Sequence, residues 1–327
     1  IVVAGFPLII AREFLIGRIN HLAVDRSALG IDRPAFKASL RTVRSVIAII
    51  EHVIMGHDVH DNLAILLLKG IGWVVDDYHC AQVSLNLTNY NFTSPLDVLV
   101  AARELAVKRG IVFTGSEVVG VVPFDAMQQA GRFYLRRMHK STGIPARDVI
   151  TTAVQAMGLS DVAEFDIDKK VIGLPVQEGP LVNLNVSDFV DEVSRDTPAP
   201  GGGSIAALAG ALGSSLASMV VNLSIGKGEY DSHYDELCQL AEQAQATKDE
   251  LTRAIDADTE AFNEVLAGMR MPKDTPEQIA LRAQTIRAGY KLASEVPLRT
   301  AQLCRQVLDF CQAAANIGNQ AVMSDAG

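Results

Sequence analysis

Cysteine, basic charge and aromatic residues are all scarce in this chain of 327 residues. The four cysteines are widely spread and form no C-x-x-C pair, which is typical of reduced thiols and predicts a cytoplasmic protein. Lys and Arg number 29 against 38 Asp and Glu, so the formal net charge is -9. A nucleic-acid partner requires a basic surface, and this charge argues against one.

The opening stretch 1–10, IVVAGFPLII, has no basic region before it and no cleavage site, which argues against a signal peptide. Its composition predicts a strand. Hydrophobic residues reach 49%, enough for a substantial core, and the length allows about two domains at ~150 residues each.

Charge is absent altogether from residues 205–225, behind the sequence TPAPGGGS. These 21 residues have the length of a membrane span, but they are rich in Gly, Ala, Ser and Asn, and no basic cluster orients them. We expect no membrane partner and predict a central core helix whose small residues let neighbouring helices approach. A phosphate-binding P-loop is disfavoured because the Lys-Ser/Thr ending and a preceding strand are missing.

Residues 70–175 alternate between strand and helix patterns. Strands are predicted at 81–87 and 111–115, and a helix at 94–110, with Ser94 as its cap and Pro95 at its first position. A second helix is predicted to start at Pro123. Two such units predict an α/β sandwich that forms a first domain over 1–175.

Residues 176–183 are predicted to be a linker, and 184–327 an all-α bundle. Ser187 is placed to cap a short helix, a long helix covers about 232–270, and a pair of helices covers 276–316. Thr275 is expected to cap the first of that pair, with Pro276 at its first position. The fold class is therefore α+β, with the bundle following the sandwich.

Glycines precede the uncharged helix at Gly201, Gly202 and Gly203. Glycines at a helix start leave backbone N–H groups free to face a ligand, and the helix dipole favours negative charge there. The alternative is a flexible elbow with Ser204 as the N-cap.

Asp258 shares the apolar stripe of the long helix, because it comes three residues after Ile255 and four before Phe262. Asp256 lies about 200° away around a helix of ~3.6 residues per turn, and we expect it to be a solvated surface charge. The stripe consists of Leu251, Ile255, Phe262, Val265 and Met269.

A carboxylate inside a helical bundle is costly unless it is paired. Removal from water also makes a carboxyl group suited to proton transfer near neutral pH. Asp258 is therefore a candidate catalytic residue, and the alternative is a structural ion pair or hydrogen bond to a neighbouring helix.

Weaker candidates lie elsewhere. His57 and His60, in HDVHDN, are thin evidence for a metal without a third ligand, and we expect no metal. Lys273 follows the long helix and would suit an acidic ligand, although solvated charge also explains it. The polar segment 318–327 is either a site loop or a helix end.

Long motifs resemble the formimidoyltransferase-cyclodeaminase family of folate enzymes. KGIGWVVDDYHCAQVSLNL and VFTGSEVVGVVPFDAMQQAGRFYL are similar to the C-terminal subdomain of the transferase. FVDEVSRDTPAPGGGSIAALAG, DADTEAF, MPKDTPEQ and GNQAVMSDAG resemble the cyclodeaminase/cyclohydrolase domain. The likeness covers about 69–327 and AREFLI at 11–16, whereas 17–68 show no match, and we expect a piece of a longer protein, incomplete at both ends.

The resemblance implies a ferredoxin-like subdomain before the bundle, and tetrahydrofolate and formimidoylglutamate as substrates. It also implies that the formimidoyl group of 5-formimidoyltetrahydrofolate closes to 5,10-methenyltetrahydrofolate with loss of ammonia. The family's catalytic aspartate falls within DADTEAF, and facing selects Asp258. Folate contacts are expected at Gly201, Gly202, Gly203, Ser204 and Lys273, in a homo-oligomer.

The resemblance also places the transferase's catalytic subdomain upstream of this chain, so we expect no transferase activity from these residues alone. Two alternatives stay open for the bundle. It is either a methenyltetrahydrofolate cyclohydrolase, or a folate-binding or assembly module without catalysis.

Overall fold

The structure is a computed structural model that describes residues 8–11, 68–75, 80–108, 112–161 and 163–327. The chain divides into two compact units, each described by itself below. The first comprises Ile1–Leu135 and Ala146–Leu174, and the second comprises Arg136–Pro145 and Pro175–Gly327. The division differs from the predicted boundaries chiefly because residues 136–145 group with the helical unit.

The first unit contains a small sheet with the strand order β2-β3-β1-β4. β1 pairs antiparallel with both β3 and β4, and β2 forms an antiparallel pair with β3 from Leu68↔Leu87 to Val75↔Cys80. The predicted strands at 81–87 and 111–115 are confirmed, and the opening stretch ends in β1. The strands are β1 (Leu8–Ala11), β2 (Leu68–Val75), β3 (Cys80–Leu87) and β4 (Val112–Ser116).

Helices complete this unit. Ser94 caps α2 as predicted, because its Oγ accepts a hydrogen bond from the backbone N–H of Asp97 at 3.2 Å. The helices are α2 (Pro95–Lys108), α3 (Phe124–Arg137), α4 (Ala146–Met157) and the short α5 (Ile167–Lys170). Leu85, Leu99, Met127 and Ile150 form part of one buried core.

The second predicted helix begins one residue late, because Pro123 ends β5 (Val122–Pro123), which pairs in parallel with β6 (Val171–Ile172). The described part of the unit is therefore a small antiparallel sheet with helices. The finer ferredoxin-like arrangement stays a prediction.

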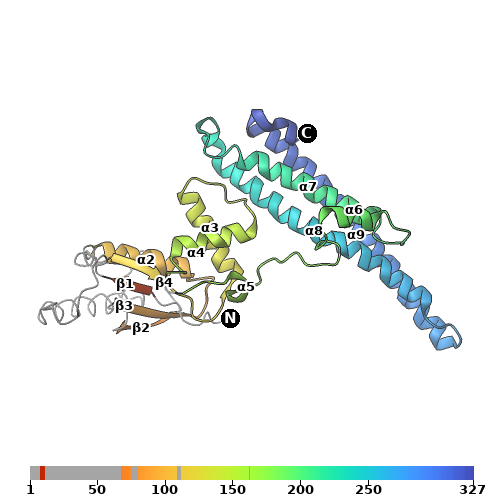
Figure 1. Ribbon diagram of the computed structural model, residues 1–327, viewed down its shortest axis with the longest axis horizontal. Helices are drawn as coiled ribbons and strands as arrows, with labels where there is room; N and C mark the ends of the chain where they lie inside the picture. The colour runs from red at the N-terminus through yellow and green to blue at the C-terminus, as the bar shows by residue number, and fades with distance from the viewer. Residues whose placement is uncertain (1–7, 12–67, 76–79, 109–111, 162) are drawn as a thin grey trace, which may run out of the picture. The chain divides into compact units, whose positions relative to one another are not determined.

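The second unit is helical, as predicted, and its long helices lie side by side in Figure 1. α8 and α9 run antiparallel and continue past the N-terminal end of α7. The elements are α6 (Val186–Val193), α7 (Gly202–Asn222), η2 (Gly228–His233), α8 (Tyr234–Arg270), α9 (Pro276–Ile317) and η3 (Gln320–Asp325).

Two predicted boundaries in this unit are wrong. Asn185 caps α6 by accepting from the N–H of Asp188, whereas Ser187 lies inside the helix. The expected pair of helices over 276–316 is one helix of 42 residues with Pro297 inside it. Proline removes a backbone donor there, but packing against α8 offsets that loss, as the buried Gly289 and Thr300 on either side indicate. The predicted cap at Thr275 is confirmed, and the Gln278 side chain completes a capping box.

α7 packs against both α8 and α9 through small side chains. Gly210 allows α9 to approach closely, because a Cβ there would lie 2.6 Å from the Cys304 sulfur. Within the described residues, α7 is also the helix that is long and apolar enough to cross a membrane, by length and composition only, and half of that stretch is buried inside the protein. The buried residues are Ser204, Ala207, Ala211, Ser214, Ala217, Ser218, Val220 and Val221.

Candidate functional site

Asp258 lies at the N-terminal end of α7. Its Oδ2 accepts a hydrogen bond from the backbone N–H of Ser204 at 3.0 Å. The N-cap of α7 is Gly201, which has no side chain to accept from the first turn. Asp258 therefore supplies, from another helix, the oxygen that an N-cap side chain normally provides. The anion held at this helix start is the protein's own carboxylate.

Glycine is required at one of the three positions before the helix. A Cβ on Gly203 would overlap both carboxylate oxygens of Asp258, Oδ1 even more closely than Oδ2 at 2.5 Å, and real Cβ atoms do not approach their neighbours so closely. A Cβ on Gly201 or Gly202 would meet no atom within 4 Å. Gly203 thus allows the carboxylate to reach α7, while the other two glycines face open space.

Ser204 belongs to the first turn of α7 and is not the N-cap, so that alternative is wrong. Its buried hydroxyl donates to the carbonyl oxygen of Ile255 at 2.7 Å and lies 3.2 Å from the Thr259 hydroxyl. The hydroxyl therefore ties α7 to the same turn of α8 that carries Asp258.

Asp256 is a buried carboxylate, and the prediction of a solvated surface charge is wrong. Only 6% of the residue is exposed, and its Oδ1 and Oδ2 accept from the N–H groups of Leu181 (2.8 Å) and Val182 (3.1 Å). A Cβ on Gly179 would come within 3.0 Å of both of its oxygens. The helical wheel placed Asp256 opposite the apolar stripe correctly, but the segment after the first unit covers that face.

The predicted stripe also needs correction at two of its large members, since Phe262 is 38% exposed and Met269 43% exposed. In their part of α8, small residues face α9 instead. A Cβ on Gly268 would lie 3.0 Å from Ile286, and one on Gly289 would lie 3.1 Å from Val265. The two backbones approach too closely there for large side chains between them.

The two aspartates differ in what their oxygens can still bind. Both oxygens of Asp256 are occupied by backbone donors. Asp258 is partly exposed, and its Oδ1 has no hydrogen-bond partner among the described residues. Asp258 can exchange a proton with a bound molecule while Oδ2 keeps it in place. It remains the catalytic candidate, although not because Asp256 is solvated.

Lys273 does not meet Asp258. It lies in the turn after α8, beyond Arg270, and about 18 Å of helix separates Asp258 from that end at ~1.5 Å per residue. Any joint role in binding one ligand would require a molecule of that length.

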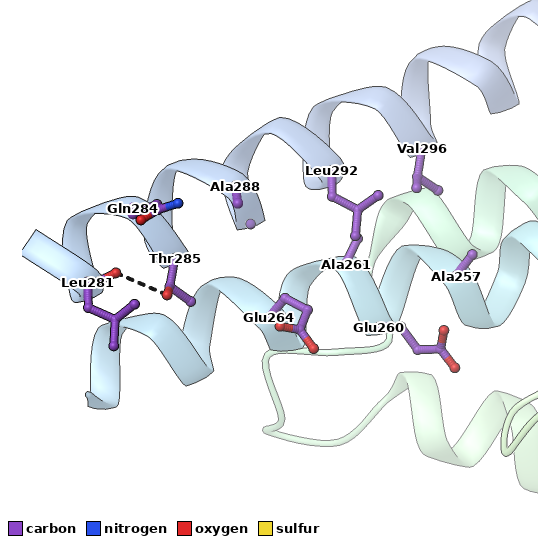
Figure 2. A pocket seen from close by; sticks show the side chains of 11 residues that line it. Ala257, Glu260, Ala261, Glu264, Leu281, Gln284, Thr285, Ala288, Leu292 and Val296 are labelled. Carbon is purple, nitrogen blue, oxygen red and sulfur yellow. Dashed lines mark hydrogen bonds between the residues drawn. The ribbon is translucent and has the colours of Figure 1, made fainter. Parts of the chain in front are cut away.

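A cavity of about 660 Å³ lies between α8 and α9, and Asp258 does not line it. Ala261 and Leu292 form part of its apolar wall, while the exposed Glu260 and Glu264 make its α8 side acidic (Figure 2). An acidic wall repels a dicarboxylate tail, so this groove does not suit the glutamate end of a folate.

Within the described residues, no group of three or more His, Cys, Asp or Glu side chains could hold a metal ion. His57 and His60 lie outside those residues. Cys238, Cys304 and Cys311 are free thiols. The segment 318–327 forms η3, which follows α9 after a short break.

Comparison with known proteins identifies two domains. The family described as "Formiminotransferase-cyclodeaminase" matches residues 185–327, and "Formiminotransferase domain" matches residues 42–177. The second match begins inside the segment 17–68 that showed no resemblance in the sequence motifs. It ends inside the predicted linker at 176–183.

Three relatives illustrate the similarity. A formimidoyltransferase-cyclodeaminase from Mus musculus is 34% identical over 79% of this chain and 48% of its own length. A methenyltetrahydrofolate cyclohydrolase from Methylorubrum extorquens is 41% identical over 44% of this chain and 70% of its own length. A glutamate formimidoyltransferase from Streptococcus pyogenes is 34% identical over 21% of this chain and 23% of its own length.

The sheet-containing unit and the helical unit follow each other in the order of the two matched domains. The class is therefore a formiminotransferase-type domain followed by a cyclodeaminase-type domain. The chain belongs to the formiminotransferase-cyclodeaminase family. It spans about half the length of the formimidoyltransferase-cyclodeaminases that it matches.

Sequence reasoning missed Asp256 and its partner Gly179. The available signal was a second carboxylate two residues from Asp258, together with a Gly-Pro pair in the preceding linker. Neither feature reveals that the linker returns to α8.

Proposed function

We propose that the helical unit closes 5-formimidoyltetrahydrofolate to 5,10-methenyltetrahydrofolate and releases ammonia. The observation that carries the proposal is a single carboxylate, Asp258, with one oxygen held at the start of α7 and the other without a hydrogen-bond partner in the described part of the chain. Family membership supplies the folate substrate class.

The reaction needs two proton transfers. N10 of the folate attacks the carbon of the protonated formimidoyl group, an amidinium, so a C–N bond forms and the exocyclic nitrogen becomes an amino group. N10 loses its proton to Oδ1 of Asp258, and the carboxyl group passes this proton to the amino group. The exocyclic C–N bond then breaks, ammonia leaves, and the methenyl bridge keeps the positive charge. One carboxyl group that accepts the first proton and returns the second is sufficient for both steps.

The fixed position of Asp258 favours this role. Its Oδ2 stays bound to the N–H of Ser204, so the carboxyl group is held at the start of α7 while Oδ1 faces the substrate. We propose that the folate lies beside Gly201 and Gly202, where the backbone faces open space, and that Lys273 binds only an extended acidic tail.

The assay follows ammonia release and methenyltetrahydrofolate formation from 5-formimidoyltetrahydrofolate. Asp258→Asn should lower kcat by about 10²–10⁴-fold, the usual contribution of a general acid–base group. Glu260→Gln removes an exposed carboxylate two residues away and should leave kcat unchanged. Full activity in the Asp258 variant would overturn the assignment.

A second candidate is hydrolysis of methenyltetrahydrofolate, favoured by the 41% identity to a relative of that name. Both reactions act on the same one-carbon bridge, so one site would suit either. Loss of methenyltetrahydrofolate without added ammonia would indicate the hydrolase. If the chain binds folate but shows no turnover in either assay, it acts as a folate-binding module without catalysis.

For the whole protein we propose formimidoyl transfer from formimidoylglutamate to tetrahydrofolate, with a ferredoxin-like first half, in a cytoplasmic homo-oligomer. The transfer rests on the match of residues 42–177. The oligomer rests on an exposed apolar row along α7, formed by Leu212, Leu216, Met219 and Leu223. Sedimentation of the purified chain tests the oligomer, with a monomer as the contrary result.

A further inference from the structure

Asp256 and Asp258 each hold a different segment against one turn of α8. Asp256 binds the N–H groups of Leu181 and Val182, and Asp258 binds that of Ser204. Each carboxylate also lies against a glycine that has no room for a Cβ, Gly179 or Gly203. The turn therefore fixes the start of α7 and the segment 179–182 together.

Apolar contacts connect the two segments. Leu181, which is 6% exposed, forms one buried cluster with Ile255 of α8 and Ala207 of α7. Ala207 lies one helical turn after Ser204, whose N–H and hydroxyl contact Asp258 and the Ile255 carbonyl. Hydrogen bonds and one buried apolar cluster thus connect Asp256 through Leu181 to the start of α7 and from there to Asp258.

We propose that Asp256 is a positioning residue for Asp258. Its carboxylate keeps Leu181 packed on Ile255 and Ala207, and this packing keeps the start of α7 where Ser204 donates to Asp258. The inference rests on the proposed function only for its effect on rate. The coupling of Asp256 to the start of α7, through Leu181, can be measured without any substrate.

Asp256→Asn is the most conservative perturbation. An amide offers one acceptor oxygen where the backbone presents two N–H donors, so one donor loses its partner. Gly179→Ala disturbs the same contact from the other side, because its Cβ would strike the carboxylate. In an Asp256→Ala background the carboxylate is gone and the Cβ of Gly179→Ala has room. The effect of Gly179→Ala on the start of α7 should therefore be smaller in that background.

Glu250→Gln is the matched control. Glu250 is another carboxylate of α8 that accepts two hydrogen bonds, from Arg299 at 2.7 and 2.9 Å. It lies eight residues before Asp258, about 12 Å along the helix at ~1.5 Å per residue. Its loss weakens the contact between α8 and α9 and leaves the start of α7 untouched.

Hydrogen exchange of the whole chain provides the first readout. In Asp256→Asn and Gly179→Ala, exchange at Leu181, Val182 and Ser204 should accelerate on the order of tenfold, and in Glu250→Gln it should not. Ser204 is the decisive amide, because a residue in the first helical turn has no intrahelical acceptor and Asp258 alone protects it. Unchanged exchange at Ser204 would overturn the proposal.

Turnover provides the second readout, at a temperature where every variant is folded by circular dichroism. Cyclisation kcat should fall about 10- to 100-fold in Asp256→Asn with little change in KM, as expected when a reacting group shifts by a fraction of an ångström. Full kcat despite faster exchange at Ser204 would also overturn the proposal. If the unaltered chain shows no cyclisation, the proposed function fails, and exchange at Ser204 still decides the positioning role.

Discussion

Gly203→Ala tests directly whether the start of α7 holds Asp258. The added Cβ would lie 2.5 Å from Oδ2 and closer still to Oδ1, and real Cβ contacts begin near 3.0 Å, so the carboxylate must withdraw by well over 0.5 Å. The hydrogen bond from Ser204, now 3.0 Å, would then exceed the usual range. Gly202→Ala is the matched control, since its Cβ would meet no atom within 4 Å.

Loss of a hydrogen bond to a charged acceptor costs about 1.5–3 kcal/mol. Replacing Gly by Ala where the backbone permits it returns about 0.4–1 kcal/mol through the unfolded chain. Gly203→Ala should therefore lose about 1–2 kcal/mol of unfolding free energy, which is a fall of roughly 2–8 °C in the Tm of a unit of this size. Gly202→Ala should be neutral or slightly stabilising.

Calorimetry of both variants, followed by the cyclisation assay, checks this. The kcat of Gly203→Ala should fall by up to about 10²-fold, because the proton-transferring group is displaced. Equal Tm and equal kcat in the two alanine variants would show that the close approach of Asp258 to α7 does not exist in solution.

Two further outcomes concern the helical unit. Arg299 donates two hydrogen bonds to Glu250 and lowers the pKa of that carboxyl group. Stability from this pair is present above the unfolded Glu pKa of about 4.3 and is lost as the pH falls through the lower folded value. Urea unfolding at pH 7 and at pH 3 gives the unfolding free energy that is lost on acidification. This loss should be greater in the parent than in Glu250→Gln, by about 1 kcal/mol or less because the pair is exposed. Identical losses in the two proteins would contradict this role of the pair. Ala288→Trp fills the groove between α8 and α9 and should leave cyclisation kcat unchanged, since Asp258 does not line that cavity; a large loss of activity would place the substrate there.

Much of the helical unit could be predicted because its signals are local. The capping box at Thr275 and the span of α8 follow from neighbouring residues alone. The continuity of α9 through Pro297 could not be predicted, for the opposite reason. A proline normally ends a helix, and only contacts with α8, which no local pattern encodes, keep α9 continuous.

The candidate site was half predictable. Periodicity placed Asp258 on the face toward the bundle, where the structure has it partly buried beside α7. The glycine run indicated a helix start suited to an anion, but it did not show that the anion would be Asp258. Asp258 reaches the start of α7 only because α7 and α8 pack with Ser204 level with Asp258 along the helix axes.

By itself, the sequence determined the family, the helical character of the second half and the pair of aspartates on one helix. Only the tertiary structure decided what each aspartate does. Helical periodicity gives the direction of a side chain, but its burial depends on which segment lies on that face. The segment 179–182, distant in the chain, covers Asp256 and donates hydrogen bonds to both of its oxygens, whereas Oδ1 of Asp258 accepts none from the residues that the structure describes.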